Sequence, residues 1–211
     1  MQIEIWSDLI CPWCYIGKRR FESAMSSVKP AYDIQIVWRS FELDPQAPTH
    51  LTETLEQMLA RKYGVSTQQA AEMNANVTQQ AASVGLKYDL SNARPGNTFA
   101  AHRLIHYAAT LGLGEKLMER LMKGYFCESL PIGNHVALTR VATNVGLDAE
   151  KVQTILASNE FEAKVRADEQ RARQIGVRGV PFFLFNEKQA ISGAQPLEVF
   201  EQAFVQATSG L

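Results

Sequence analysis

Hydrophobic and polar residues alternate along two short stretches near the start of the chain. The alternation predicts one strand over 2–8 and another over 34–41, because the side chains of a half-buried strand point to opposite faces in turn. Between them, over 12–28, apolar residues recur at three- and four-residue spacing, which predicts a helix. A strand, a helix and a second strand within about 40 residues form a βαβ unit, whose strands are parallel and whose crossover is right-handed.

The middle of the chain follows a helical pattern. Two prolines within 43–48 interrupt the first pattern and mark a boundary. Ser66 and Gln69 form the signature of a capping box, which opens a helix that ends at Gly85. The same reasoning predicts helices over 97–112 with Asn97 as its cap, near 114–128, 135–145 and 149–157, and over 159–176 with Asn159 as its cap.

The period changes back near the end of the chain. Residues 181–185 and 190–192 are predicted to be strands, joined by a turn at 186–188. A last helix is predicted from Pro196, in a first-turn position, to Thr208.

This order of elements implies a sheet that is assembled from both ends of the chain around a helical middle. We therefore expect an α/β fold with a mixed central sheet flanked by helices. Its core domain would combine 1–42 with 160–211, and an all-helical domain over 43–159 would be inserted between them. A chain of 211 residues is long enough for a core domain that carries an inserted one.

The composition is that of an ordinary globular protein. Apolar residues at 46% and charged residues at 20% exclude a disordered chain, a collagen-like fibre and a disulfide scaffold. The 21 basic and 22 acidic side chains form no long run of one sign, so we expect no nucleic-acid partner. A mean hydropathy of -0.16 and the lack of a long apolar run predict no membrane span. The first residues carry no secretory signal, which leads us to expect a cytoplasmic protein.

The motif Cys11-Pro12-Trp13-Cys14 lies where the first predicted strand leads into the first predicted helix. Two cysteines three residues apart at a helix start lie on one face, close enough to form a disulfide. The unpaired N–H groups and the positive dipole end of the helix favour the thiolate form of Cys11. Pro12 costs nothing there, because the first helical residue donates no intrahelical hydrogen bond. We expect Cys11 to be an exposed nucleophile and Cys14 a buried resolving thiol, which suits thiol–disulfide exchange through a mixed disulfide.

A zinc site is an alternative use of two such cysteines, but the sequence has no second cysteine pair.

Cys127 stands alone, and we expect it to be a buried helix thiol; the alternative is an accessory thiol that reaches Cys11. His102 and His106 have the spacing of a zinc-binding helix, yet Arg103 stands where a metalloprotease helix has its glutamate. We therefore expect no metal, and packing or substrate-groove roles for both histidines.

A second motif far downstream completes a family resemblance. Gly176-Val-Arg-Gly-Val-Pro-Phe-Phe-Leu-Phe185 places Pro181 directly before an apolar strand. Together with the Cys-Pro-Trp-Cys motif, it resembles the thioredoxin superfamily, and the long helical insert resembles the DsbA branch of that superfamily. The chain is similar over its whole length to FrnE-type DsbA-like oxidoreductases in the motifs Ser7-Asp8, Trp38–Pro45, Asn97-Thr98, Ala101–Leu104 and Ser192–Pro196.

The resemblance implies a thioredoxin fold and assigns roles to single residues. Cys11 would be the attacking cysteine and Cys14 the resolving cysteine. Pro181 would follow a cis peptide bond, a conformation that only about 5–6% of X–Pro bonds adopt in folded proteins. The backbone of Val180 would then face Cys11 and pair with an extended substrate as a short strand does.

The resemblance also indicates partners. The substrates would be proteins, peptides or small molecules that carry a thiol or a disulfide, and Pro12 and Trp13 would be available to contact them. No cofactor is implied, and glutathione is a candidate redox partner.

Two other functions compete with disulfide exchange. Glutathione-dependent enzymes of the kappa-class transferase or 2-hydroxychromene-2-carboxylate isomerase type share the expected fold, but they typically have a serine where this chain has Cys11. They also tend to carry a Ser-Asp pair where this chain has Ala194-Gln195. The third candidate is a binding protein or chaperone whose helical insert captures clients.

Overall fold

The structure, a computed structural model, describes residues 1–29, 33–49 and 52–208. The chain divides into two compact units. Unit 1 combines Met1–Leu43 with Asp168–Leu211, and unit 2 is Asp44–Ala167. Unit 1 holds a mixed sheet and unit 2 is helical, so the expected fold class, a thioredoxin fold with a large helical insert, is confirmed. Within the described ranges, no helix is both long enough and apolar enough to cross a membrane.

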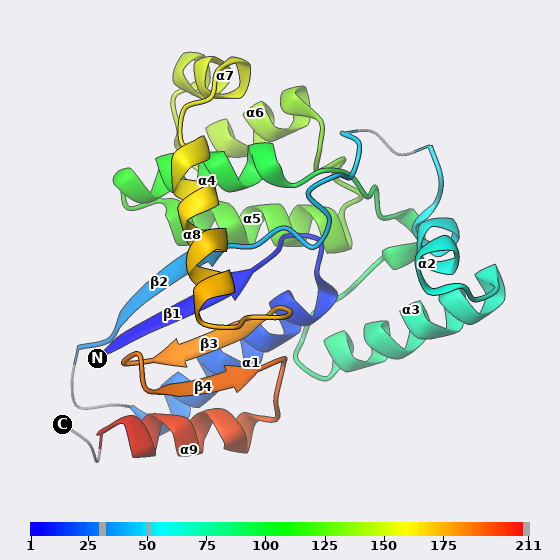
Figure 1. The fold of residues 1–211 in the computed structure, drawn as a ribbon. Helices are drawn as coiled ribbons and strands as arrows, with labels where there is room; N and C mark the ends of the chain where they lie inside the picture. The colour runs from blue at the N-terminus through cyan, green and yellow to red at the C-terminus, as the bar shows by residue number, and fades with distance from the viewer. Residues whose placement is uncertain (30–32, 50–51, 209–211) are drawn as a thin grey trace. The chain divides into compact units, whose positions relative to one another are not determined.

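Unit 1 is built on a four-stranded sheet in the order β2-β1-β3-β4 (Figure 1). The strands β1 and β2 are parallel, as the predicted βαβ unit requires, and Ile5 lies opposite Trp38. Strand β3 pairs antiparallel with β1 and with β4. The elements of unit 1 are β1 (Gln2–Ser7), α1 (Pro12–Val28), β2 (Gln35–Ser40), β3 (Phe182–Phe185), β4 (Gln189–Ser192) and α9 (Leu197–Thr208).

The two faces of this sheet bury different side chains, because residues alternate along each strand. Ile3 and Ile5 of β1 belong to a core with Phe21 of α1 and with aromatic residues of β3 and α9. Trp6 points the other way and packs with Ala172 of α8 (Glu162–Gln174). Helices α1 and α9 therefore cover one face, and the C-terminal part of α8 covers the other (Figure 1).

Unit 2 consists of helices, in which α4 packs with α5, α6 and α7, and α2 pairs with α3. The predicted capping box at Ser66 and Gln69 is confirmed at the start of α3. The elements of unit 2 are α2 (Leu55–Tyr63), α3 (Thr67–Ala82), a 3-10 turn (Leu90–Asn92), α4 (Phe99–Thr110), α5 (Gly114–Cys127), α6 (His135–Asn144) and α7 (Ala149–Ala157).

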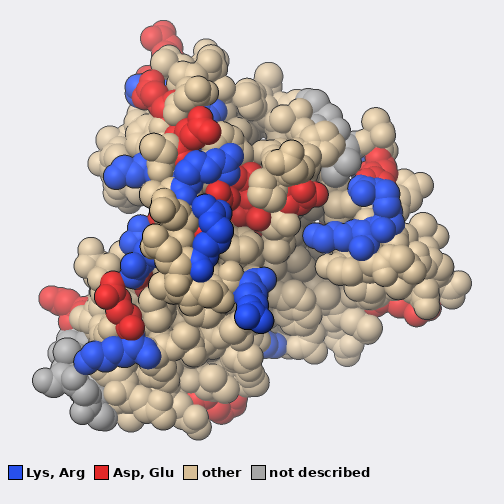
Figure 2. All heavy atoms as spheres, in the orientation of Figure 1, with Lys and Arg blue, Asp and Glu red and all other residues tan. Residues whose placement is uncertain are grey.

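Helix α8 (Glu162–Gln174) continues across the boundary between the units at 167/168, whereas the sequence suggested a boundary at 159/160. Helix α2 was not predicted as a separate element. The last helix begins at Leu197, one residue later than expected, so Pro196 precedes it. Basic and acidic side chains are interleaved over α8 on the face that Figure 2 presents.

Candidate functional site

The site begins at the loop between β1 and α1, where Cys11 is the N-cap residue of α1 and Pro12 occupies its first position. The Cys11 N–H donates to Asp8 O at 3.2 Å, and the Cys14 N–H donates to Cys11 O at 3.0 Å. Proline fits here because it has no N–H to leave unpaired. Cys11 thus lies at the positive end of the helix dipole, with Cys14 in the first turn.

Both cysteines are buried, and neither is in a disulfide. Cys14 is 2% exposed, as expected for a resolving thiol, but Cys11 is 4% exposed, so the expectation that it is solvent-exposed is wrong. The physical reason is the chain that faces it, because Cys11 Sγ donates to the carbonyl oxygen of Val180 at 3.4 Å. Trp13 is 39% exposed and Pro12 is half-buried, so the residues between the cysteines present the surface of the motif.

The loop before β3 brings Val180 to Cys11, and the peptide bond between Val180 and Pro181 is cis. The carbonyl of Pro181 accepts a hydrogen bond from the N–H of Gly193 at 2.8 Å, which ties the loop to the end of β4. Gly17, in the second turn of α1, lies directly beneath: a Cβ built there would be 2.9 Å from Pro181 Cγ. The absence of a side chain at Gly17 therefore lets the loop approach the helix.

Burial raises the pKa of the Cys14 thiol well above its ordinary range, because a thiolate loses the solvation of water there. The hydrogen bond and the charge of Cys11 raise this pKa further, while the Ser7 hydroxyl and the backbone of Asp8 act in the opposite direction. Cys14 is therefore protonated at neutral pH. The two sulfurs of the motif are therefore unequal: Cys14 holds its proton inside the first turn, while Cys11 lies at the N-cap of the helix.

Charged groups beside the motif are buried and paired. Asp8 is fully buried and its Oδ2 accepts from the Leu43 N–H at 2.7 Å, which fixes the chain that follows β2. The Lys18 ammonium, also buried, bonds to Glu22 and lies 5.9 Å from the centre of the Trp38 ring. The contact of Lys18 with Trp38 links α1 to β2, and the hydrogen bond of Asp8 links the loop before α1 to the chain after β2.

The other candidate residues of the sequence lie in unit 2. Cys127 is half-buried rather than buried, because it is the last residue of α5. Its pKa is raised, mainly by burial and to a smaller extent by the negative charge of Glu128. His102 is buried and His106 is half-buried in α4. Among the described residues, no three side chains of metal-binding type are grouped together.

Sequence reasoning missed two residues that shape these units. Gly17 could have been found as a glycine inside a predicted helix, which usually marks a close approach. Arg103 was considered only in relation to metal ligands. Its buried guanidinium instead donates to carbonyl groups at the end of α7, including Ile155 O at 2.9 Å.

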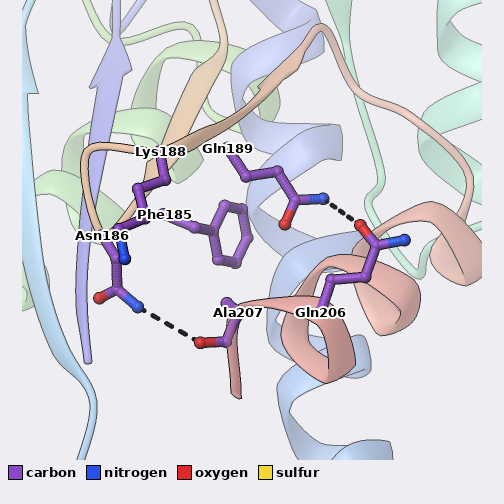
Figure 3. A pocket seen from close by; sticks show the side chains of 6 residues that line it. All are labelled: Phe185, Asn186, Lys188, Gln189, Gln206 and Ala207. Carbon is purple, nitrogen blue, oxygen red and sulfur yellow. Dashed lines mark hydrogen bonds between the residues drawn. The ribbon is translucent and has the colours of Figure 1, made fainter. Parts of the chain in front are cut away.

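A pocket of about 310 Å³ lies at the other end of β3 from Pro181 (Figure 3). Three of its polar side chains bond within the pocket wall: Gln189 Nε2 donates to Gln206 Oε1 at 2.8 Å, and Asn186 Nδ2 donates to Ala207 O at 3.5 Å. The pocket contains neither cysteine of the motif, so the candidate site remains at the cysteines.

This dithiol at the start of α1, on a sheet with a helical insert, is the arrangement of a thioredoxin-type protein. The family model for the DsbA-like thioredoxin domain matches residues 2–205, so the chain belongs to this family of thiol oxidoreductases. It is 42% identical to a probable DsbA oxidoreductase from Streptomyces coelicolor, with a TM-score of 0.95 over 99% of this chain and 90% of that one. An uncharacterised protein of Bacillus subtilis, YwbO, is 27% identical over 96% of this chain and 95% of its own length.

More distant structures share the fold. A cytosolic disulfide reductase from Pseudomonas aeruginosa, DsbM, solved with glutathione, is 16% identical with a TM-score of 0.64 over the whole of both chains. A 2-hydroxychromene-2-carboxylate isomerase is 14% identical with a TM-score of 0.73 over 100% of this chain and 97% of that one. At such identities the likeness concerns the fold alone.

Proposed function

We propose that this protein is a thiol–disulfide oxidoreductase that exchanges disulfides with protein or small-thiol substrates, with Cys11 as nucleophile and Cys14 as resolving thiol. The observation that carries the proposal is the inequality of the two sulfurs. Cys11 lies at the positive end of α1, while Cys14 is buried with a raised pKa. A nucleophile that is charged first and a partner that is charged only later are what a two-step exchange requires.

The first step joins the enzyme to its substrate. The Cys11 thiolate attacks one sulfur of the substrate disulfide, whose S–S bond breaks, and the other substrate sulfur leaves as a thiolate that takes up a proton. In the second step Cys14 loses its proton and attacks Cys11 Sγ, which releases the remaining substrate sulfur. The substrate disulfide gains two electrons and the protein dithiol loses two; the reverse sequence oxidises a substrate dithiol.

Val180 would hold the substrate during this exchange. In the free dithiol its carbonyl accepts from the Cys11 thiol. A mixed disulfide has no hydrogen on Cys11 Sγ, so this carbonyl becomes available to an N–H of the substrate, which can bind as an extended strand. Pro181 shapes this edge, and Pro12 and the exposed Trp13 supply contact surface.

Glutathione fits this proposal as a small redox partner, and the proposal includes no bound cofactor. The glutathione in the fold relative DsbM supports this choice, since a short thiol peptide suits the edge at Val180. We assign the chain to the FrnE-type branch on its sequence motifs. A reducing, cytoplasmic setting completes the proposal, in which the dithiol predominates; a protein that is mostly oxidised inside growing cells would contradict it.

The proposal is tested by single cysteine replacements, with insulin and oxidised glutathione as substrates. Cys14→Ser should accumulate a mixed disulfide on Cys11, detected by intact mass, because the resolving step is removed. Cys11→Ser should form none and lose turnover, while the matched control Cys127→Ser should keep full turnover and accumulate no mixed disulfide. Full turnover in Cys11→Ser would refute the dithiol mechanism, and glutathione binding without any disulfide exchange would favour an isomerase-type activity instead.

A further inference from the structure

Ser7, the last residue of β1, places a hydroxyl group inside unit 1. The residue is 3% exposed. Strand alternation directs its side chain to the same face of the sheet as Ile3 and Ile5, which is the face that α1 covers. Its Oγ is buried and has no hydrogen-bond partner among the described residues.

An unpaired hydroxyl in such a place is unfavourable for folding. Burying a polar group without a hydrogen bond costs free energy, because the group loses its bonds to water and gains none in return. Alanine would have nearly the same shape without this cost. A hydroxyl at Ser7 therefore calls for a role that the resting dithiol does not display.

The neighbouring group whose chemistry changes is the sulfur of Cys14, in the first turn of α1. As a thiol it needs no donor, but as a thiolate it is a strong acceptor in a site closed to water. The burial that raises the pKa of Cys14 is opposed by the Ser7 hydroxyl and by the Asp8 backbone. Of these two, only the hydroxyl can rotate to meet a newly formed charge.

We propose that Ser7 is a positioning residue for the resolving step, in which its hydroxyl donates a hydrogen bond to Cys14 Sγ while that sulfur carries negative charge. This inference rests on the proposed disulfide exchange. It adds a donor that acts on Cys14 and leaves Cys11 unaffected.

The hydrogen bond acts in both directions of exchange. During reduction of a substrate, Cys14 gives up its proton, its thiolate attacks Cys11 Sγ, and the Cys11–Cys14 bond forms as the bond from Cys11 to the substrate sulfur breaks. During oxidation of a substrate dithiol, a substrate thiolate attacks Cys11 Sγ and Cys14 leaves as the thiolate. The charge on Cys14 arises in each case, and the Ser7 hydroxyl stabilises it.

The two steps can be followed separately with an aromatic disulfide, 5,5′-dithiobis(2-nitrobenzoate). Each step releases one coloured thiolate, the first when Cys11 is modified and the second when Cys14 resolves the mixed disulfide. Stopped-flow absorbance on the reduced Cys127→Ser chain, which removes the third thiol, thus reports two phases, and the same chain with Cys14→Ser identifies the first phase because it stops there.

We expect Ser7→Ala to leave the rate of the first phase unchanged and to slow the second phase about tenfold. This is the effect expected when one hydrogen bond to a charged sulfur is lost. The pH at which the second phase becomes fast should move upward. Asp8, the buried acidic residue next to Ser7, is the same in both proteins, so the comparison isolates the Ser7 hydroxyl. The midpoint of thermal unfolding should stay the same or rise, because an unpaired hydroxyl has been removed.

Two further variants make the test specific. Ser7→Thr keeps a hydroxyl at this position and should retain most of the rate of the second phase. Ser40→Ala removes a buried serine at the paired position of β2 and should leave both phases unchanged.

The inference is overturned if Ser7→Ala resolves the mixed disulfide as fast as the unchanged protein. A lower unfolding midpoint in Ser7→Ala would also overturn it, since the hydroxyl would then be paired in the folded state. Either result leaves the proposed function intact, whereas a protein that releases no second thiolate even with Ser7 present would refute the proposed function itself.

Discussion

Gly17 is a single residue that allows two parts of the site, helix α1 and the loop before β3, to lie in contact. Glycine in a helix interior lowers stability by about 1 kcal/mol relative to alanine, so its presence in α1 needs a reason. The reason is the loop above it, since a Cβ at this position would lie 2.9 Å from Pro181 Cγ and 3.4 Å from Ala194 Cβ. The glycine keeps α1 and the Val180–Pro181 segment in contact.

We expect Gly17→Ala to lower both stability and the rate of mixed-disulfide formation at Cys11. Overpacking lowers the free energy of unfolding by about 1–3 kcal/mol, and the better helix propensity of alanine raises it by about 1 kcal/mol. The net loss of stability is therefore up to about 2 kcal/mol. Chemical denaturation and the first phase of the aromatic disulfide reaction measure the two effects. Gly179→Ala is the stability control, because nothing lies within 4 Å of its added Cβ; equal stability of the two variants would contradict the packing account.

Glu4 is a residue whose contribution depends on pH. Its carboxylate, 3% exposed, bonds to Arg171 Nε at 2.9 Å and to Arg39 Nε at 2.8 Å. Burial alone would raise the pKa of Glu4, but the hydrogen bonds and charges of the two arginines outweigh it and hold this pKa below the ordinary value of 4.5. The carboxylate therefore stabilises the fold fully above about pH 4.5, and this contribution is lost as the pH falls through the lower folded value.

We expect Glu4→Gln to lower the free energy of unfolding at pH 7 by about 1–3 kcal/mol, because the ion pairs with Arg39 and Arg171 are replaced by hydrogen bonds from charged arginines to a neutral amide. The variant should also lose part of the acid sensitivity of the unchanged protein below pH 4.5, as followed by denaturation at several pH values. Glu187→Gln is the matched control, since Glu187 binds the same Arg171 from a side chain that is 69% exposed. An equal loss in both variants would show that burial of Glu4 is unimportant.

These residue-scale features mark a limit of sequence reasoning. The motif at Cys11 and Cys14 could be predicted because its partners are three residues apart. Glu4, Arg39 and Arg171 could not be linked, because they meet only after β1, β2 and α8 are assembled. The burial of Cys11 was missed for the same reason, since the Val180 carbonyl comes from a distant part of the chain.

At the scale of elements, the end of α7 is held by a side chain from another helix. Arg103 of α4 donates to Ile155 O, to Ser158 O at 2.5 Å and to Glu160 O at 3.2 Å. The last carbonyl groups of a helix lack intrahelical partners and carry the negative end of its dipole, so a buried cation is well matched to them. Arg103 thereby fastens α7, and the chain that follows it, to α4.

We expect Arg103→Met to lower the free energy of unfolding by about 1–3 kcal/mol, because several buried acceptors lose their donor. Arg166→Met is the control. Arg103 and Arg166 both lie over the Phe99 ring, 5.4 Å and 4.3 Å from its centre, but the Arg166 side chain is 43% exposed, so its loss should cost about 0.5–1 kcal/mol. Hydrogen exchange of α7 amides reports where the loss occurs. Unchanged protection of α7 in Arg103→Met would argue against the capping role.

Helix boundaries were predictable where a local signature decided them. The capping box at Ser66 and Gln69 uses residues three apart, and both of its hydrogen bonds are present. Thr54 and Gln57 form the same box at the start of α2. That helix was not separated from the helical stretch, although Leu55, Met58 and Leu59 have helical spacing and the capping signature lies directly before them.

At the scale of the whole molecule, the sequence predicted a sheet made from both ends of the chain, and the strand pairing agrees. Strand β1 pairs on one side with β2, from the same βαβ unit, and on the other side with β3, from the far end of the chain. This was predictable because short strand-like segments return only after the helical stretch. The register of β1 with β3, and with it the meeting of Val180 and Cys11, could not be derived, because no local pattern encodes a contact across 169 positions.

The central claim is that Cys11 and Cys14 act as one redox couple. Its most direct test is the oxidation state of the two cysteines in graded glutathione buffers, measured by alkylation and intact mass, with Trp13 fluorescence as a second probe. The account predicts one reversible two-electron transition that is absent in Cys11→Ser and retained in Cys127→Ser. Its midpoint should lie within the range of about -270 to -120 mV that thioredoxin-fold dithiols span. A protein that binds glutathione but shows no reversible couple at these two cysteines would contradict the account.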